Sequence, residues 1–128
     1  MTAWDRLLTE FEAWAAAGQV AELWWRDDDA IDVTPALYRL LALRADLNVP
    51  LALAVIPANA RPALAGVLKG QTGIDILQHG YAHISHRSVG EKKAELGADR
   101  DLWDIARELS DGRGRMLELF DSAWLSVM

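Results

Sequence analysis

The sequence predicts a single α/β domain of about four short parallel strands with surrounding helices. The chain has 128 residues, 52% of them hydrophobic, which suits one domain with a buried core. Short apolar runs alternate along it with segments of helical periodicity, a pattern that favours parallel strands joined by right-handed crossovers. One run, VPLALAVIP at residues 49–57, is apolar throughout, which is typical of a strand buried on both faces of a parallel sheet.

The first two elements are predicted by periodicity and composition. Apolar residues recur at helical spacing over residues 1–18, where Thr2 is the expected N-cap and Gly18 the residue just after the helix. The segment VAELWW at 20–25 follows. Because it is short, aromatic and partly β-branched, it predicts the first strand.

The middle of the chain continues the alternation of helices and strands. The segment TPALYRLLALRADLN at 34–48 predicts a helix capped by Thr34. The apolar run 49–57 predicts the second strand, and ARPALAGVLKG at 60–70 predicts a short helix. The segment GIDILQHG at 73–80 predicts the third strand, which leads directly into a group of histidines.

The last third of the chain begins with a polar, glycine-punctuated loop at about 85–100. Apolar residues at helical spacing then predict a long helix over 102–120, which we expect to be weakened near Gly112 and Gly114. The segment AWLSVM at 123–128 predicts a fourth strand.

Composition excludes several classes of protein. The formal net charge of −6 argues against a nucleic-acid-binding surface, which would show clustered Lys and Arg. Cysteine is absent, so no disulfide or thiolate metal site can form. The apolar run 49–57 is far shorter than the ~18 residues of a membrane span, and charges interrupt the N-terminal segment where a signal peptide would be apolar. We therefore expect a cytoplasmic protein with neither nucleic-acid nor membrane partners.

Three adjacent carboxylates follow the first predicted strand, at Asp27, Asp28 and Asp29. In parallel α/β folds, ligands gather at the carboxyl ends of the strands. Adjacent carboxylates raise each other's pKa unless a cation neutralises them, and a divalent metal would do so. The alternative is a solvated acidic turn that caps the next helix, which is the better interpretation for the nearby Asp32.

All three histidines of the chain, His79, His83 and His86, lie within eight positions after the third predicted strand. The spacing of His79 and His83 would put both rings on one face of a helical turn, as in many zinc sites. The alternative is a pair of capping or core histidines, but their position opposite three aspartates favours a metal site. His86 falls outside the spacing and is expected to lie near the site, to contact substrate or to be solvated in the loop.

The stretches WWRDDDA and LQHGYAHISH resemble the first two motifs of the polysaccharide deacetylase family, carbohydrate esterases with a NodB-like distorted (β/α) barrel. The stretches VPLALAVIPA and GEKKAELG, the latter at 90–97, are also similar to a bacterial branch of that family. The resemblance covers about residues 20–125. It implies that the single domain 1–128 comprises an N-terminal helix at 1–18 and the N-terminal half of such a barrel at 20–128.

The resemblance also implies roles for individual residues. In the family, the first of two adjacent aspartates is the general base and the second binds the metal together with both histidines of H-x3-H. Carried over to this chain, Asp28 is the catalytic base, and Asp29, His79 and His83 are the metal ligands. This set of oxygen and nitrogen donors suits zinc best, with nickel, cobalt or iron as alternatives.

The register of the aspartates is ambiguous because this chain has three of them. We align the family's pair with Asp28 and Asp29, because Ala30 then takes the place of the family's glycine. The register with Asp27 as base and Asp28 as ligand stays open. Arg26 is expected either to orient the base by a charge-assisted hydrogen bond or to pair with the surplus aspartate.

The function implied by the resemblance is metal-dependent hydrolysis of N-acetyl groups on a carbohydrate or a related small amide. The family's later motifs, an Arg/Pro motif and a late histidine, are absent from the sequence, so we expect an incomplete catalyst. The alternatives are a non-catalytic metal- or ligand-binding remnant of the same fold and an unrelated α/β domain. Half a barrel would leave sheet edges open, which predicts self-association or a complementing C-terminal half as partner.

Overall fold

A computed structural model describes residues 1–120 of the chain, and the fourth strand predicted at 123–128 lies outside them. Within the described residues, three parallel strands form one sheet in the order β1-β2-β3. They are β1 (Arg26–Ala30), β2 (Leu51–Val55) and β3 (Ile74–Gln78). The predicted α/β class with parallel pairing is confirmed, whereas three strands do not by themselves show a barrel.

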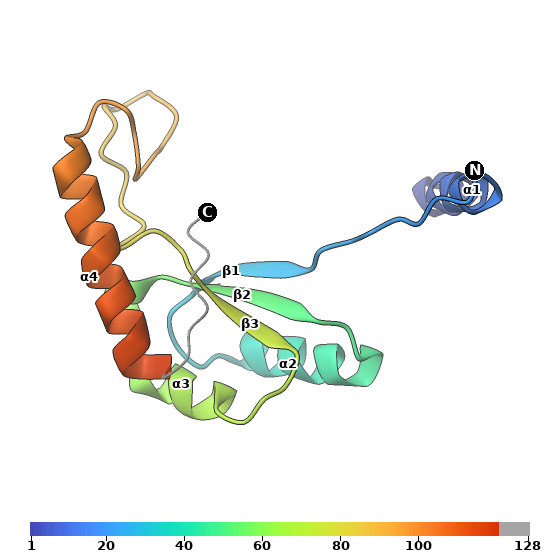
Figure 1. Ribbon diagram of the computed structural model, residues 1–128, viewed down its shortest axis with the longest axis horizontal. Helices are drawn as coiled ribbons and strands as arrows, with labels where there is room; N and C mark the ends of the chain where they lie inside the picture. Colours follow the sequence, from blue (N-terminus) through green and yellow to red (C-terminus); the bar gives the residue numbers. More distant parts are fainter. Residues whose placement is uncertain (121–128) are drawn as a thin grey trace.

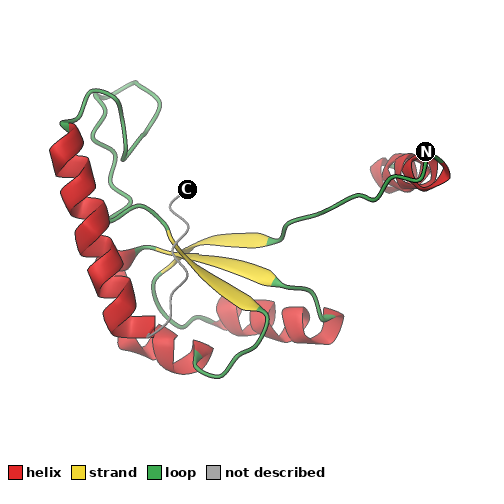
Figure 2. Ribbon diagram, in the orientation of Figure 1, coloured by secondary structure: helices red, strands yellow, loops and turns green. Residues whose placement is uncertain are grey.

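Helices follow each strand, as the alternating pattern predicts. They are α2 (Pro35–Leu47), α3 (Pro62–Leu68) and α4 (Leu102–Phe120), with a short 3₁₀ turn η1 (Pro57–Asn59). Helices α2 and α3 lie on one face of the sheet, and α4 runs beside the carboxyl ends of the strands (Figures 1 and 2). The side chain of Thr34 caps α2, as expected, by accepting a hydrogen bond from the N–H of Leu37 at 3.1 Å.

Helix α1 (Ala3–Ala16) confirms the predicted N-terminal helix and its cap. Thr2 and Asp5 form a reciprocal capping box, and Gly18 adopts the positive φ expected just after a helix. The helix contains no buried residue and projects away from the sheet (Figure 1). No helix within residues 1–120 is both long and apolar enough to cross a membrane.

The strand predicted at 20–25 is wrong. The structure places β1 at Arg26–Ala30, so the three aspartates lie within the strand rather than after it. Val20 and Leu23 are each 83% exposed, and the ladder to β2 begins where the Trp25 carbonyl accepts a hydrogen bond from the N–H of Ala52. Strand formation here follows pairing with β2 rather than the β propensity of the aromatic residues.

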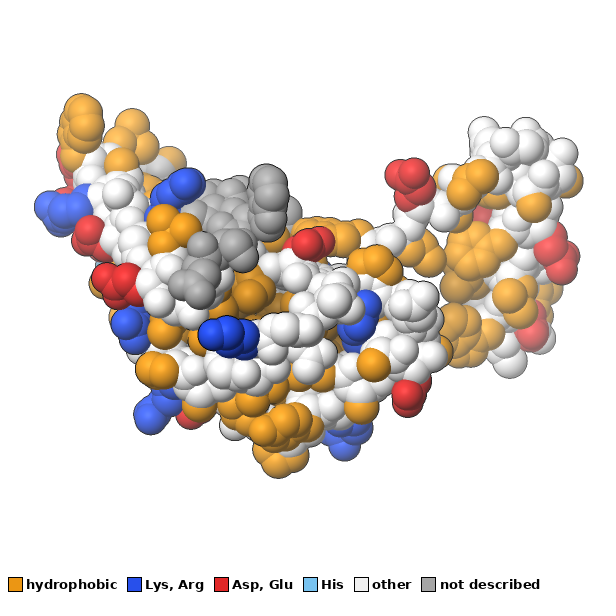
Figure 3. All heavy atoms as spheres, turned by 60° about the horizontal axis from the view of Figure 1, so that its bottom comes forward, with side chains coloured by type: hydrophobic (Ala, Val, Ile, Leu, Met, Phe, Trp, Pro, Cys, Tyr) orange, Lys and Arg blue, Asp and Glu red, His pale blue; other side chains and the backbone are white. Residues whose placement is uncertain are grey.

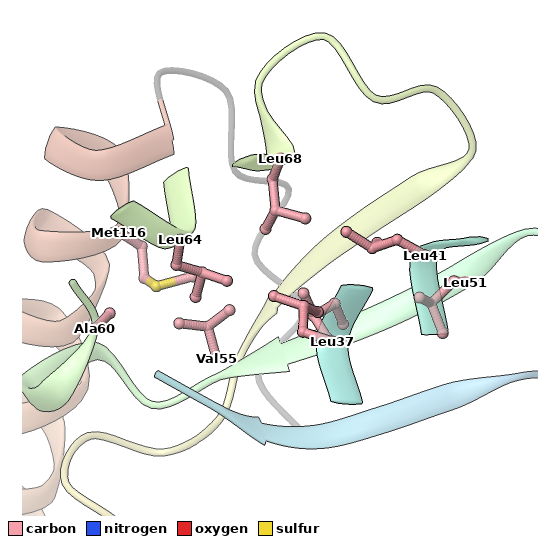
Figure 4. Close-up of a cluster of buried hydrophobic side chains, with 9 residues drawn as sticks. Leu37, Leu41, Leu51, Val55, Ala60, Leu64, Leu68 and Met116 are labelled. Atoms are coloured by element: carbon pink, nitrogen blue, oxygen red, sulfur yellow. The ribbon is translucent and has the colours of Figure 1, made fainter. Parts of the chain in front are cut away.

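The core is built around β2, whose five residues are all buried. Alternate side chains of a strand point to opposite faces, so Leu51, Leu53 and Val55 share one face. Figure 4 shows how side chains from α2, α3 and α4 pack against that face. The buried cluster comprises Leu37, Leu41, Leu51, Leu53, Val55, Ala60, Leu64, Leu68 and Met116.

Helix α4 continues through both glycines, so the predicted weakening does not interrupt it. Gly112 is buried against β3, and a Cβ atom there would lie 2.5 Å from Gln78 Nε2 and 3.2 Å from Pro57 Cγ. The Gln78 amide occupies this space because it donates hydrogen bonds to the carbonyls of Gly80 and Leu109, at 2.9 and 3.0 Å. Gly112 therefore permits the close approach of α4 to the sheet. Gly114 is exposed and has no such neighbour.

The two glycines should respond oppositely to alanine. Gly114→Ala is expected to stabilise the chain by up to about 1 kcal/mol, because alanine favours the helix. Gly112→Ala should destabilise it, because the new methyl group displaces the Gln78 amide and breaks its buried hydrogen bonds. Urea unfolding of both variants measures the difference. Equal stabilisation by the two substitutions would contradict the packing of α4 on Gln78.

Candidate metal centre

The carboxyl ends of β1 and β3 are joined to two adjacent residues at the end of β2, Ile56 and Val55. The Val55 carbonyl accepts a hydrogen bond from the N–H of His79 at 2.8 Å, and the N–H of Ile56 donates to the Ala30 carbonyl at 3.1 Å. Asp29 precedes Ala30 and His79 follows β3 directly. The parallel sheet thus brings Asp29 and His79 to the same edge, although β1 begins later in the chain than the strand predicted at 20–25.

A bulge in β1 aims Asp29 toward that edge. Asp27 pairs with Leu53, but Ala30 pairs with Val55, so two residues of β1 lie opposite one residue of β2. Asp29 has a φ of +65°, a left-handed conformation that Asp tolerates better than most residues. Bulges of this kind redirect a side chain at the end of a strand. This bulge was not predicted from the sequence.

The histidines are brought together by a tight loop rather than by the helical turn that their spacing suggested. Residues 79–83 are not helical, and Gly80 and His83 both adopt positive φ, at +59° and +57°. The two imidazole rings lie with their centroids 5.0 Å apart and their planes 53° from parallel. The prediction that both rings share one site agrees with this geometry, but the local structure behind it was wrong.

Asp29, His79 and His83 form a cluster whose potential ligand atoms all lie within 4.8 Å of one another. Asp29 Oδ1 is 3.2 Å from His79 Nε2 and 3.3 Å from His83 Nδ1. Atoms that bind one tetrahedral zinc at about 2.0–2.2 Å lie about 3.3–3.5 Å apart. Charge-assisted hydrogen bonds are usually shorter, at about 2.7–2.9 Å. The two distances from Asp29 Oδ1 to the imidazole nitrogens therefore fit ligands of one metal ion.

Arg26 connects this cluster to Asp28. Its guanidinium forms an ion pair with the Asp28 carboxylate, and Nη2 lies 3.3 Å from His79 Nδ1. It also lies over the Trp24 ring, 5.5 Å from the ring centroid. The Arg26 side chain is only 18% exposed, whereas that of Asp28 is 47% exposed. Of the two roles expected for Arg26, the contact with Asp28 corresponds to orienting the candidate base.

The other two acidic residues near the site differ in their surroundings. The pKa of Asp27 is raised, mainly because burial removes hydrating water from its carboxylate. Repulsion from Asp28 and Asp29 adds to the rise in pKa. Asp32 instead forms an ion pair with Arg61, with Oδ2 3.2 Å from Nε, and accepts the N–H of Val33. Asp32 therefore orders the turn before α2, while Thr34 rather than Asp32 caps the helix.

His86 lies outside the cluster of possible ligands found in the described part of the chain. It is exposed, and its N–H donates to the Ala94 carbonyl at 3.1 Å. Of the roles expected for His86, this exposed position agrees with that of a solvated loop residue.

A further acidic residue, Glu95, contacts the histidine loop and was not predicted as part of the site. Its Oε1 atom accepts hydrogen bonds from the backbone N–H groups of Tyr81, Ala82 and His83. The stretch GEKKAELG contains Glu95, but nothing in its residue types indicates which distant backbone groups a glutamate will bind.

Comparisons of the chain with protein-family models, with curated proteins and with solved structures find no match. The resemblance to polysaccharide deacetylases therefore stays a prediction.

The cluster geometry predicts that the chain binds roughly one equivalent of zinc with micromolar or tighter affinity. His79→Ala and His83→Ala should each lose this binding, because two protein ligands hold zinc poorly. His86→Ala is the matched control and should bind as the wild type does. Competition with a chromophoric chelator measures all four affinities. Equal loss on removing His86, or no zinc binding by the wild type, would contradict the assignment.

Proposed function

We propose that this chain is a polysaccharide deacetylase-like protein that hydrolyses N-acetyl groups of a carbohydrate or a related small amide. The observation that carries the proposal is the Asp29–His79–His83 cluster, with the carboxylate of Asp28 held beside it by Arg26. A metal-bound water deprotonated by an adjacent carboxylate is a recurring arrangement for amide hydrolysis. The three-stranded parallel sheet would then belong to the first half of a (β/α) barrel.

Within this proposal, Asp29, His79 and His83 hold the metal, with zinc as the expected ion. A bound zinc ion would polarise the acetyl carbonyl and lower the pKa of its water. Asp28 would act as the general base that takes a proton from the attacking water, and Arg26 would orient the Asp28 carboxylate. Asp27 is the competing base in the other register of the three aspartates.

The second candidate function is non-catalytic binding of a metal or ligand by the same fold. It is favoured by the openness of the cluster, because the side chains of Asp29 and His83 are 54% and 51% exposed. Enzymes that polarise a carbonyl generally exclude water from the reacting groups.

Acetate release from N-acetylated sugar oligomers separates the two functions. The zinc-loaded chain is expected to release acetate slowly, and Asp28→Asn should lower the rate by about 10²–10⁴-fold because it removes the base. Asp32→Asn is the matched control, because the Asp32 carboxylate contacts the N–H of Val33 and the guanidinium of Arg61. Unchanged zinc binding without any acetate release would favour the non-catalytic function. Equal rates for Asp28→Asn and the wild type would exclude Asp28 as base.

We also propose that the chain associates with itself or with a complementing C-terminal half of the barrel. Apolar side chains are exposed along α1 and the segment that follows it (Figure 3), including Trp4 at 73% and Trp24 at 63%. Large exposed apolar surfaces usually mark interaction sites. Size-exclusion chromatography with light scattering should show a dimer or larger species for the purified chain. A monomer that resists heating would contradict self-association.

A further inference from the structure

The loop that carries His83 is closed by a single carboxylate from another part of the chain. Glu95 Oε1 accepts hydrogen bonds from the backbone N–H groups of Tyr81, Ala82 and His83, at 3.1, 2.7 and 3.1 Å. Successive N–H groups that converge in this way form a concave anion-binding site in the backbone. Because the acceptor is charged, each bond is stronger than one between neutral groups.

Gly80 is required by the same arrangement. Its φ of +59° is a conformation that glycine adopts without a steric penalty. In addition, a Cβ atom at Gly80 would collide with Glu95 Oε2. The backbone of the loop and the Glu95 carboxylate therefore fit one another only when residue 80 has no side chain.

Glu95 is itself fixed to helix α4. Arg100 Nη1 donates to the Glu95 carbonyl at 3.2 Å, and the Arg100 guanidinium binds both carboxylate oxygens of Glu108 in α4, at 2.9 and 2.7 Å. These hydrogen bonds from Arg100 lower the pKa of Glu108, so Glu108 is ionised at neutral pH. The carboxylate that holds the histidine loop is thus connected to the longest helix of the described chain.

The two histidines of the cluster are held in different ways. His79 directly follows β3, and its N–H belongs to the sheet through the Val55 carbonyl. His83 lies four residues further on, in a left-handed conformation, and its N–H is bound by Glu95. The sheet therefore fixes one imidazole, whereas the conformation of the loop determines where the other is presented.

We propose that Glu95 is a positioning residue that brings His83 Nδ1 to the metal centre without binding the metal. This inference rests on the metal site of the proposed function. Glu95 does not belong to the cluster of Asp29, His79 and His83, and it contacts the backbone N–H of His83 rather than the ring. Groups that orient a metal ligand from outside the coordination shell typically change metal affinity by about 10–100-fold when removed.

Three variants test this role by zinc competition with a chromophoric chelator, alongside thermal unfolding without metal. Glu95→Ala should weaken zinc binding by about tenfold or more, because the loop loses its acceptor. Glu95→Gln keeps an oxygen that can accept the same three bonds, so it should restore most of the affinity. Glu91→Ala is the matched control. Glu91 lies in the same loop but accepts the N–H of Ser88, at 3.1 Å, rather than those of Tyr81, Ala82 and His83, so zinc affinity should not change.

If the wild type binds zinc and a folded Glu95→Ala variant binds it equally tightly, Glu95 does not position His83. The metal site itself would then still be supported. A wild-type chain that binds no zinc would overturn both proposals. Amide hydrogen exchange of Tyr81, Ala82 and His83 in the metal-free wild type provides a second test that needs no variant. These three amides are expected to exchange slowly. If they exchange as fast as amides of an unstructured loop, the role of Glu95 is overturned, even where the Glu95→Ala variant does not fold.

Discussion

The candidate site depends on the central position of strand β2 between β1 and β3. Neighbouring strands lie only about 4.8 Å apart, so the flanking strands end close together when both pair with the end of the same central strand. Val55 and Ile56 provide those pairings, to His79 on one side and to Ala30 on the other. The burial of β2 in turn depends on the apolar faces of α2, α3 and α4. Packing in the core is therefore what brings acidic and imidazole side chains together at the edge of the sheet.

Local backbone conformation completes what the sheet begins. The sheet brings the two strand ends together, but the contacts of Asp29 with both imidazoles depend on left-handed residues. Asp29 reaches the histidines from a bulge, and His83 returns toward β1 through a loop that contains Gly80. Left-handed conformations of residues other than glycine cost free energy and persist where surrounding contacts hold them. The Glu95 carboxylate provides such contacts for the histidine loop.

The sequence allowed much of the fold to be predicted where one local signal dominated. The uniform apolar run of β2 and the Thr34 cap of α2 are such cases. The strand at 20–25 was misplaced because an edge strand forms where its partner pairs, not where β propensity is highest. At the site, spacing indicated that His79 and His83 share one site, and the resemblance to polysaccharide deacetylases implied Asp29 as their partner. Neither predicted the bulge, the loop or Glu95, because each depends on contacts between residues distant in sequence.

The central claim is that one aspartate and two histidines from different strand ends bind a single metal ion. X-ray absorption spectroscopy of the zinc-loaded chain tests it most directly, because imidazole rings give a characteristic outer-shell scattering pattern. The expected result is a four-coordinate zinc with two imidazoles and oxygen ligands, at about 2.0–2.2 Å. A zinc ion surrounded by oxygen atoms alone, with no imidazole scattering, would contradict the account of the site.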